Sequence, residues 1–165
     1  MLELWLVRHG ESLGNLDGSG SDSPLSVAGR EQAESLRSKL AQVDFDRVLS
    51  SPLLRARETA ALALPDSPPA IEPSLRELVA PSERFVDISS LTPEQLRALL
   101  ERPASGPERE SGKAFMQRVR AWVEALPDTG RILAFTHFAV VREVLRLHGP
   151  APQTIAFASI SIVRR

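Results

Sequence analysis

The chain has 165 residues, of which 42% are hydrophobic, enough to form one ordinary core, and its formal net charge is −1. A nearly neutral chain lacks the excess of positive charge that attracts nucleic acid. The lack of cysteine excludes disulfides, thiolate catalysis and thiolate metal sites. The apolar run at residues 2–7 is too short for a signal-peptide core, and no run is long enough to cross a bilayer. We therefore expect a soluble, cytoplasmic protein that binds neither nucleic acid nor membranes.

The first half of the chain predicts strands that alternate with helices. A strand buried on both faces is expected at residues 4–7, because the run is apolar without alternation. In chain order there follow a glycine-rich loop at 14–24, a helix at 27–40 with Ser26 as its N-cap, a strand at 47–50, a helix at 53–64 and a short edge strand at Ile71.

The second half continues the alternation after a stretch without clear periodicity at residues 73–92. The expected elements are a helix from Thr92 to about Leu100, a proline-rich connection at 102–108, a helix from Ser111 or Gly112 to about Leu126, a strand at 131–135, a helix at 139–147, and two last strands at 155–157 and 159–163. This order predicts an α/β fold with a mostly parallel sheet and helices on both faces, in a single domain over 1–165.

Polar side chains follow three of the predicted strands directly. They are Arg8, His9 and Asn15 after the first strand, Ser50, Ser51 and Arg55 after the second, and Thr136 and His137 after the third. In parallel sheets, ligands bind beyond the carboxyl ends of the strands, so these groups are expected to converge. Guanidinium groups match phosphate oxygens in shape and charge. The pattern therefore favours a phosphoryl-binding site.

Five segments, in order, resemble motifs of the histidine phosphatase superfamily, which includes cofactor-dependent phosphoglycerate mutases and many small phosphatases. They are LVRHGESLGN, SPLSVAGREQA, SSPLLRARETA, SLRE and FTHFAVVREVL, which span residues 6–145. The resemblance implies a phosphoglycerate mutase-like fold, a three-layer α/β/α domain.

The resemblance also implies roles for individual residues. His9 would be the nucleophile that forms a phosphohistidine, and Glu77 would be the acid that protonates the leaving oxygen, with Glu83 as the competing acid. His137 joins these two in the catalytic set. The phosphoryl oxygens would be held by Arg8, Asn15, Arg55, His137 and the backbone at Phe138. Gly10 is expected to let the backbone approach the ligand closely.

The sequence departs from the family pattern at two places. Phe138 stands where many relatives have glycine, so its ring either narrows the pocket or turns away and leaves the backbone donor usable. After SLRE the chain continues with LVAPSERF, where many relatives have a different segment. This departure affects the expected placement of the acid and the expected wall of the substrate pocket.

The expected function is that of a phosphatase acting on phosphomonoesters of a small molecule. A protein phosphohistidine phosphatase is the alternative, while a phosphoglycerate mutase and a non-catalytic phosphate-binding protein are less favoured. No cofactor is implied, and no metal, because the two histidines have no carboxylate partners at metal-ligand spacing. The expected partner is the small-molecule substrate, and the oligomeric state stays open.

Overall fold

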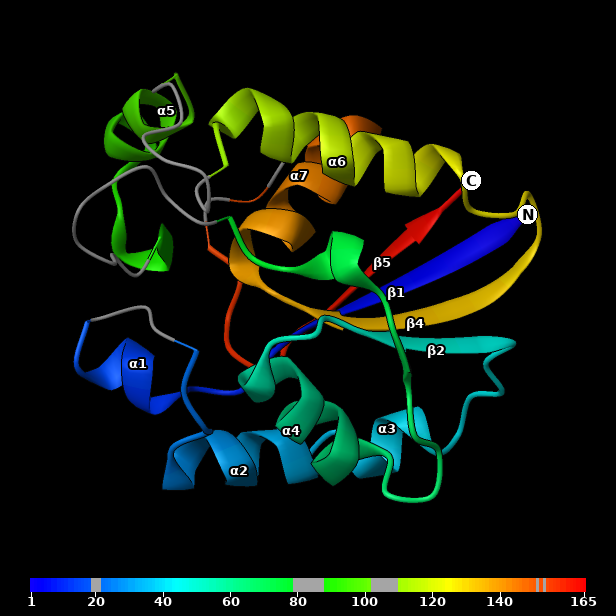
Figure 1. The fold of residues 1–165 in the computed structure, drawn as a ribbon. Helices are drawn as coiled ribbons and strands as arrows, with labels where there is room; N and C mark the ends of the chain where they lie inside the picture. The colour runs from blue at the N-terminus through cyan, green and yellow to red at the C-terminus, as the bar shows by residue number, and fades with distance from the viewer. Residues whose placement is uncertain (19–21, 79–87, 102–109, 151, 153) are drawn as a thin grey trace.

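The chain folds into a five-stranded sheet with helices on both faces (Figure 1). The computed structural model describes residues 1–18, 22–78, 88–101, 110–150, 152 and 154–165. The strands are β1 (Leu2–Arg8), β2 (Arg47–Ser50), β3 (Ala70–Ile71), β4 (Gly130–Thr136) and β5 (Ile160–Arg164). The helices are α1 (Leu13–Leu16), α2 (Val27–Glu34), α3 (Arg37–Leu40), α4 (Leu54–Ala63), α5 (Pro93–Glu101), α6 (Gly112–Glu124) and α7 (Phe138–His148), with 3-10 turns η1 (Pro73–Leu75) and η2 (Ile88–Ser90).

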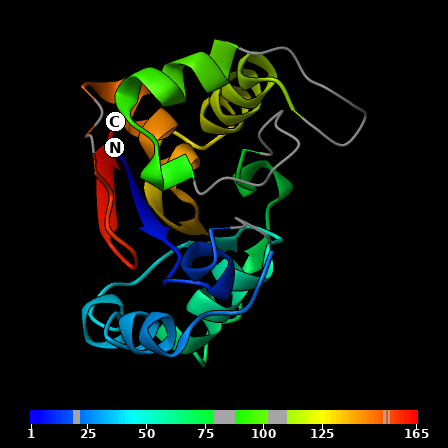
Figure 2. The ribbon, with the colours of Figure 1, turned by 90° about the vertical axis from the view of Figure 1, so that its left-hand side faces the viewer.

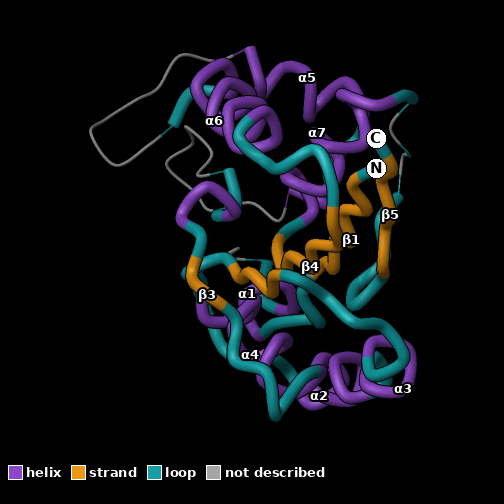
Figure 3. The backbone as a smooth tube through the Cα atoms, turned by 90° about the vertical axis from the view of Figure 1, so that its right-hand side faces the viewer, coloured by secondary structure: helices purple, strands orange, loops and turns teal. Residues whose placement is uncertain are grey.

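The sheet has the strand order β3-β2-β4-β1-β5, and Figure 3 shows β4, β1 and β5 following one another across it. Every neighbouring pair is parallel except β1 with β5. Arg8 lies opposite Thr136 in the β1–β4 pair, and Ser50 lies opposite Phe135 in the β2–β4 pair. The carboxyl ends of three strands therefore meet at one edge of the sheet. The predicted α/β class with a mostly parallel sheet is confirmed.

Each face of the sheet buries its own apolar cluster. Figures 1 and 2 show one group of helices on each face. Leu4 and Leu6 of β1 belong to the cluster under α5, α6 and α7, whereas Val7 belongs to the cluster over α3 and α4. This explains why the first strand is apolar without alternation. Each fully buried side chain of this size contributes about 1.5–3 kcal/mol relative to exposure.

The helix predicted over 27–40 is interrupted after Glu34. The Ser35 hydroxyl donates to the Gln32 carbonyl at 2.7 Å, and the Leu36 N–H donates to the Ala33 carbonyl, three residues back, at 3.2 Å. These local bonds compete with the regular helical ladder and tighten the chain into a turn. The prediction of one continuous helix was wrong at this point.

The strand predicted at 155–157 does not form. The Ile155 carbonyl accepts a hydrogen bond from the Arg8 guanidinium at 2.5 Å, and the Ala156 carbonyl accepts from the Ser159 N–H at 3.3 Å. Ala158 adopts a positive φ of 50°, which belongs to a turn. The backbone groups that a strand would use for pairing are thus engaged by a turn and by Arg8.

Some expected segments fall outside the described residues. These are the connection at 102–108 and residues 79–87 of the aperiodic stretch, whose described parts carry η1 and η2. Within the described ranges, none of the helices has the length and apolar character that a membrane crossing requires.

Two glycines let the loop after β1 lie directly on the start of α2. A Cβ at Gly29 would overlap the carbonyl oxygen of Glu11, and a Cβ at Gly10 would overlap the carbonyl oxygen of Gly29. The close approach holds the residues after His9 in place through backbone packing. Gly10 therefore has a structural reason to lack a side chain, whatever it does toward a ligand.

Gly29→Ala tests this contact. Alanine in a helix is normally about 1 kcal/mol more favourable than glycine, but here the added Cβ forces the Glu11 backbone to move. We expect a net loss of roughly 1–3 kcal/mol in the free energy of unfolding, the usual cost of overpacking, measured by urea denaturation. Gly149→Ala is the control, because nothing lies within 4 Å of a Cβ there. Equal stability of Gly29→Ala and the unmodified protein would contradict the packing argument.

Candidate active site

The ends of β1, β2 and β4 bring His9, Ser51 and His137 together. The His9 N–H donates to the Thr136 carbonyl at 2.9 Å, and the Ser51 N–H donates to the Phe135 carbonyl at 2.9 Å. These bonds extend the strand ladders by one residue and fix both histidines at the edge of the sheet. The two imidazole rings lie with their centroids 5.1 Å apart.

The His9 ring is buried and held from both sides. Its Nδ1 lies 2.6 Å from the Gly10 carbonyl oxygen, and a carbonyl only accepts, so Nδ1 carries the proton. Its Nε2 then has a lone pair, which accepts from the Arg55 Nε–H at 3.2 Å. Burial, and after it the Arg55 charge, holds the pKa of His9 well below its ordinary value of 6.5. The ring is therefore neutral, with Nε2 as its nucleophilic atom.

Arg55 comes from the first turn of α4 and is itself buried. The Thr59 hydroxyl donates to the Arg55 carbonyl at 2.7 Å and accepts from the Gly10 N–H at 3.0 Å, which ties α4 to the loop after His9. On the outer side, Arg55 Nη1 lies 3.5 Å from Asp22 Oδ1, which also accepts from the Leu54 N–H at 2.8 Å. The cation is thus fixed between the nucleophilic atom and the rim of the site.

His137 is fully buried, and only one of its ring nitrogens has a hydrogen-bond partner in the part of the chain that the structure describes. Its Nε2 lies 2.7 Å from the Ser51 hydroxyl, whereas its Nδ1 has no partner there. The Ser51 oxygen accepts from the Leu53 N–H at 3.2 Å, and its hydroxyl can either donate to His137 Nε2 or accept from it. Burial and the nearby Arg55 charge lower the pKa of His137.

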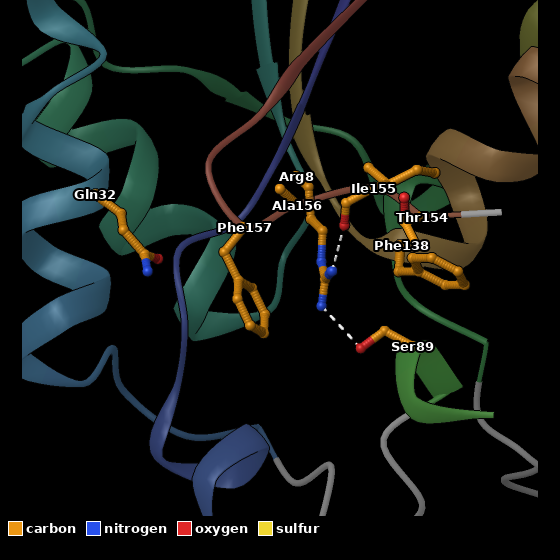
Figure 4. A pocket seen from close by; sticks show the side chains of 8 residues that line it. All are labelled: Arg8, Gln32, Ser89, Phe138, Thr154, Ile155, Ala156 and Phe157. Carbon is orange, nitrogen blue, oxygen red and sulfur yellow. Dashed lines mark hydrogen bonds between the residues drawn. The ribbon is translucent and has the colours of Figure 1, made fainter. Parts of the chain in front are cut away.

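The Arg8 guanidinium lies between two aromatic rings, as Figure 4 shows, with its Cζ 3.9 Å from the Phe157 centroid and 5.4 Å from the Phe138 centroid. It donates to the Ile155 carbonyl at 2.5 Å and to the Ser89 hydroxyl at 3.0 Å. These contacts fix its orientation. An open cavity of about 440 Å³ lies beside it, whose described lining consists of Arg8, Gln32, Ser89, Phe138, Thr154, Ile155, Ala156 and Phe157.

Glu77 approaches the site from the segment after η1. Its Oε1 accepts from the Leu78 N–H at 3.0 Å, and its Oε2 accepts from the Ala139 N–H, in the first turn of α7, at 3.4 Å. Burial raises the pKa of Glu77, although Arg55 and Arg8 oppose the shift through their charges. A carboxyl with a raised pKa keeps its proton to higher pH, as a general acid requires.

The other predicted site residues lie as follows. Asn15 completes the capping box of α1, whose N-cap is Ser12: its Oδ1 accepts from the Ser12 N–H at 3.0 Å and from the Ser12 hydroxyl at 2.7 Å. Phe138 is the first residue of α7, where backbone N–H groups have no partner within the helix, and its ring is buried. Glu83 lies outside the described residues. The phosphate roles of Asn15 and Phe138 stay predictions.

Sequence reasoning missed two contacts of the histidines. Ser51 was placed among the polar residues expected to converge, but no role was given to its hydroxyl, which contacts His137 Nε2. Phe157, in the segment predicted as a strand, lies with its ring centroid 5.9 Å from that of His9. The position of Ser51, directly after a strand and before proline, was a usable signal, whereas nothing local marked Phe157.

The chain is similar to known proteins over most of its length. The model of the histidine phosphatase superfamily (branch 1) matches residues 4–164. The adenosylcobalamin/alpha-ribazole phosphatase of Salmonella typhi is 35% identical over 153 residues, which cover 85% of this chain and 76% of that protein. The Escherichia coli K12 protein of the same name is 48% identical over 82 residues, 47% of this chain and 40% of that protein.

A solved structure supports the fold assignment independently. The phosphoglycerate mutase from Thermus thermophilus has a TM-score of 0.77 and 37% identity, covering 99% of this chain and 95% of that chain. The predicted phosphoglycerate mutase-like, three-layer architecture is thereby confirmed. From its matched residues, its motifs and its fold, the chain belongs to branch 1 of the histidine phosphatase superfamily and is an enzyme of the histidine phosphatase type.

Proposed function

We propose that this enzyme hydrolyses phosphomonoesters of a small molecule through a phosphohistidine on His9. The observation that carries the proposal is the state of the His9 ring. Its proton is fixed on Nδ1 by the Gly10 carbonyl, and its Nε2 lone pair lies against the Arg55 cation. A neutral imidazole needs no separate base to attack the phosphorus of a bound dianion, once the Arg55 Nε–H has turned from Nε2 to a phosphoryl oxygen.

The surrounding donors suit the three phosphoryl oxygens. Arg8 and Arg55 bring two positive charges, and the buried His137 ring, in the tautomer with its proton on Nδ1, supplies a donor beside His9. Asn15 and the Phe138 backbone N–H are assigned to the same group from the family resemblance. Fixed donors aimed at phosphoryl oxygens are the main source of catalysis in such reactions, because charge spreads over those oxygens in the transition state.

The reaction then proceeds in two displacements. In the first, His9 Nε2 forms a bond to phosphorus while the bond from phosphorus to the ester oxygen breaks, and the Glu77 proton passes to that oxygen. In the second, water attacks phosphorus, its proton passes to the Glu77 carboxylate, and the bond between phosphorus and Nε2 breaks. The products are an alcohol and inorganic phosphate, with His9 and Glu77 restored.

The lining of the cavity beside Arg8 suits an uncharged alcohol portion. Among its described lining residues, Arg8 is the charged one, and the remainder are aromatic, aliphatic, hydroxyl or amide groups. Alpha-ribazole phosphate, which the names of the two relatives indicate, is the first ester to test. The phosphohistidine phosphatase alternative is less favoured, because a phosphoramidate leaving group needs little help from an acid such as Glu77.

His9→Asn should abolish turnover, with a loss of roughly a thousandfold or more, as for removal of other covalent nucleophiles. Acid-labile, base-stable phosphate should appear on the unmodified enzyme after a denaturing quench and be absent from the variant. His148→Asn is the matched control, because this exposed histidine lies at the end of α7 and donates locally, to the Val144 carbonyl. Residual activity of His9→Asn within about tenfold of the unmodified enzyme would exclude His9 as the nucleophile.

Arg55→Met should raise the pKa of His9. The Arg55 charge is one of the two main causes that lower it, so its removal moves the pKa back toward 6.5. Since the neutral ring is the reactive form, the acid limb of the rate profile should shift to higher pH. Side-chain NMR titration of His9 measures the effect, and Arg57→Met, which removes an exposed cation from the same helix, is the control. An unchanged His9 pKa in Arg55→Met would contradict the electrostatic assignment.

Glu77→Gln should slow alkyl phosphates by about a hundredfold or more, nitrophenyl phosphate much less, and a phosphohistidine substrate least. The order follows from how much each leaving group needs a proton. Because the pKa of Glu77 is raised, the acid form persists above the usual carboxyl range and is lost as pH rises through that pKa. The alkaline limb for alkyl esters should therefore disappear in the variant. Equal losses on all three substrates would assign Glu77 to pocket shape or to the water step.

A further inference from the structure

The backbone that leads into Glu77 is held by side chains at three successive carbonyls. The Ser74 and Arg76 carbonyls accept from Nη1 of Arg118, in α6, at 2.6 and 3.2 Å. The Leu75 carbonyl between them accepts from the Thr136 hydroxyl at 2.7 Å. The segment is therefore fixed between α6 and the end of β4, one residue before Glu77.

Arg118 is itself fixed by Glu110. Its Nε and Nη2 donate to the two carboxylate oxygens of Glu110 at 2.8 and 2.6 Å, and the two side chains are only 15% and 9% exposed. Its Cζ also lies 5.1 Å from the Phe115 ring centroid. A two-point ion pair of this kind sets the plane of the guanidinium. Nη1 is thereby directed at the carbonyls of the 74–76 segment.

The contacts of the Glu77 side chain explain why this backbone matters. Its carboxyl oxygens accept from the N–H groups of Leu78 and Ala139, so its position follows the main chain. A displacement of a catalytic group by about 1 Å can cost a hundredfold in rate. Whatever fixes residues 74–76 therefore fixes the distance from the acid to the leaving oxygen.

We propose that Arg118, held by Glu110, is a positioning residue for Glu77, an inference that rests on the acid role proposed above. Arg118 acts through the main chain and touches neither the phosphoryl group nor His9 in this scheme. Its loss should weaken proton donation to the leaving oxygen and spare the attack of His9. A merely stabilising residue would instead lower the activity on every substrate by the same factor, along with the melting temperature.

Arg118→Met and Arg118→Lys, assayed on an alkyl phosphate and on nitrophenyl phosphate, test the proposal. For Arg118→Met we expect kcat on the alkyl ester to fall about ten- to a hundredfold, part of the factor that an acid supplies, and kcat on the nitrophenyl ester to change less than about threefold. KM should change little on either. Arg118→Lys retains the charge without the planar guanidinium group. Its kcat on the alkyl ester should therefore lie between those of Arg118→Met and the unmodified enzyme.

The control is Arg120→Met, on the same helix, whose pair with Glu124 is 66% and 65% exposed, and it should leave both rates unchanged. Glu110→Gln should reproduce the Arg118→Met pattern in weaker form. If Arg118→Met does not fold, Thr136→Val, which removes the bond to the Leu75 carbonyl, is compared with Thr136→Ser, which keeps the hydroxyl. The alkyl-selective loss is then expected for valine and its rescue for serine.

Two results would overturn the proposal: equal losses on both esters, or no loss on the alkyl ester in a folded variant. Glu77→Gln, assayed in parallel, separates this failure from a failure of the proposed function. If Glu77→Gln shows the alkyl-selective loss and the Arg118 variants do not, Arg118 is not a positioning residue and the acid assignment stands. If Glu77→Gln shows no selectivity, the acid assignment itself fails, and the inference with it.

Discussion

The site depends on one constraint, the hydrogen bonds that hold the His9 ring on both of its nitrogens. The Gly10 carbonyl at 2.6 Å requires a proton on Nδ1, and the Arg55 Nε–H at 3.2 Å requires a lone pair on Nε2. The two requirements are satisfied by a single tautomer of the neutral ring. Burial and the adjacent cation favour the same neutral form. The proposed nucleophile is therefore held in its neutral form by its surroundings.

The sheet supplies this arrangement because parallel strands end together. In the register of β1, β2 and β4, Arg8 stands opposite Thr136 and Ser50 opposite Phe135, so the residues that follow each strand share one edge. Side-chain hydroxyls then connect that edge to its surroundings. Thr59 connects α4 to the loop after His9, and Thr136 connects β4 to the segment that carries Glu77. The proposed acid Glu77, the proposed nucleophile His9 and the Arg55 cation are thus connected through hydrogen bonds.

Most strands, and the positions of the two histidines at the strand ends, could be predicted from the sequence, because apolar runs mark buried strands and a polar side chain directly after such a run is informative. His9 and His137 are found in this way. The contacts that orient these two histidines could not be predicted, because they depend on side-chain directions between segments far apart in the chain. In the sequence Arg118 is one more charge on an amphipathic helix, yet in the structure it donates to the carbonyls of Ser74 and Arg76. The turn before β5 was mistaken for a strand, because the side chain that binds its Ile155 carbonyl belongs to Arg8, at the other end of the sequence.

The stereochemical course at phosphorus tests the central claim, covalent catalysis by His9, most directly. The substrate is a phosphorothioate monoester made chiral at phosphorus with one heavy isotope of oxygen and hydrolysed in water enriched in another. Each in-line displacement inverts phosphorus, so attack by His9 followed by attack of water predicts net retention of configuration. Net inversion would show a single direct attack by water, and would contradict the proposed phosphohistidine.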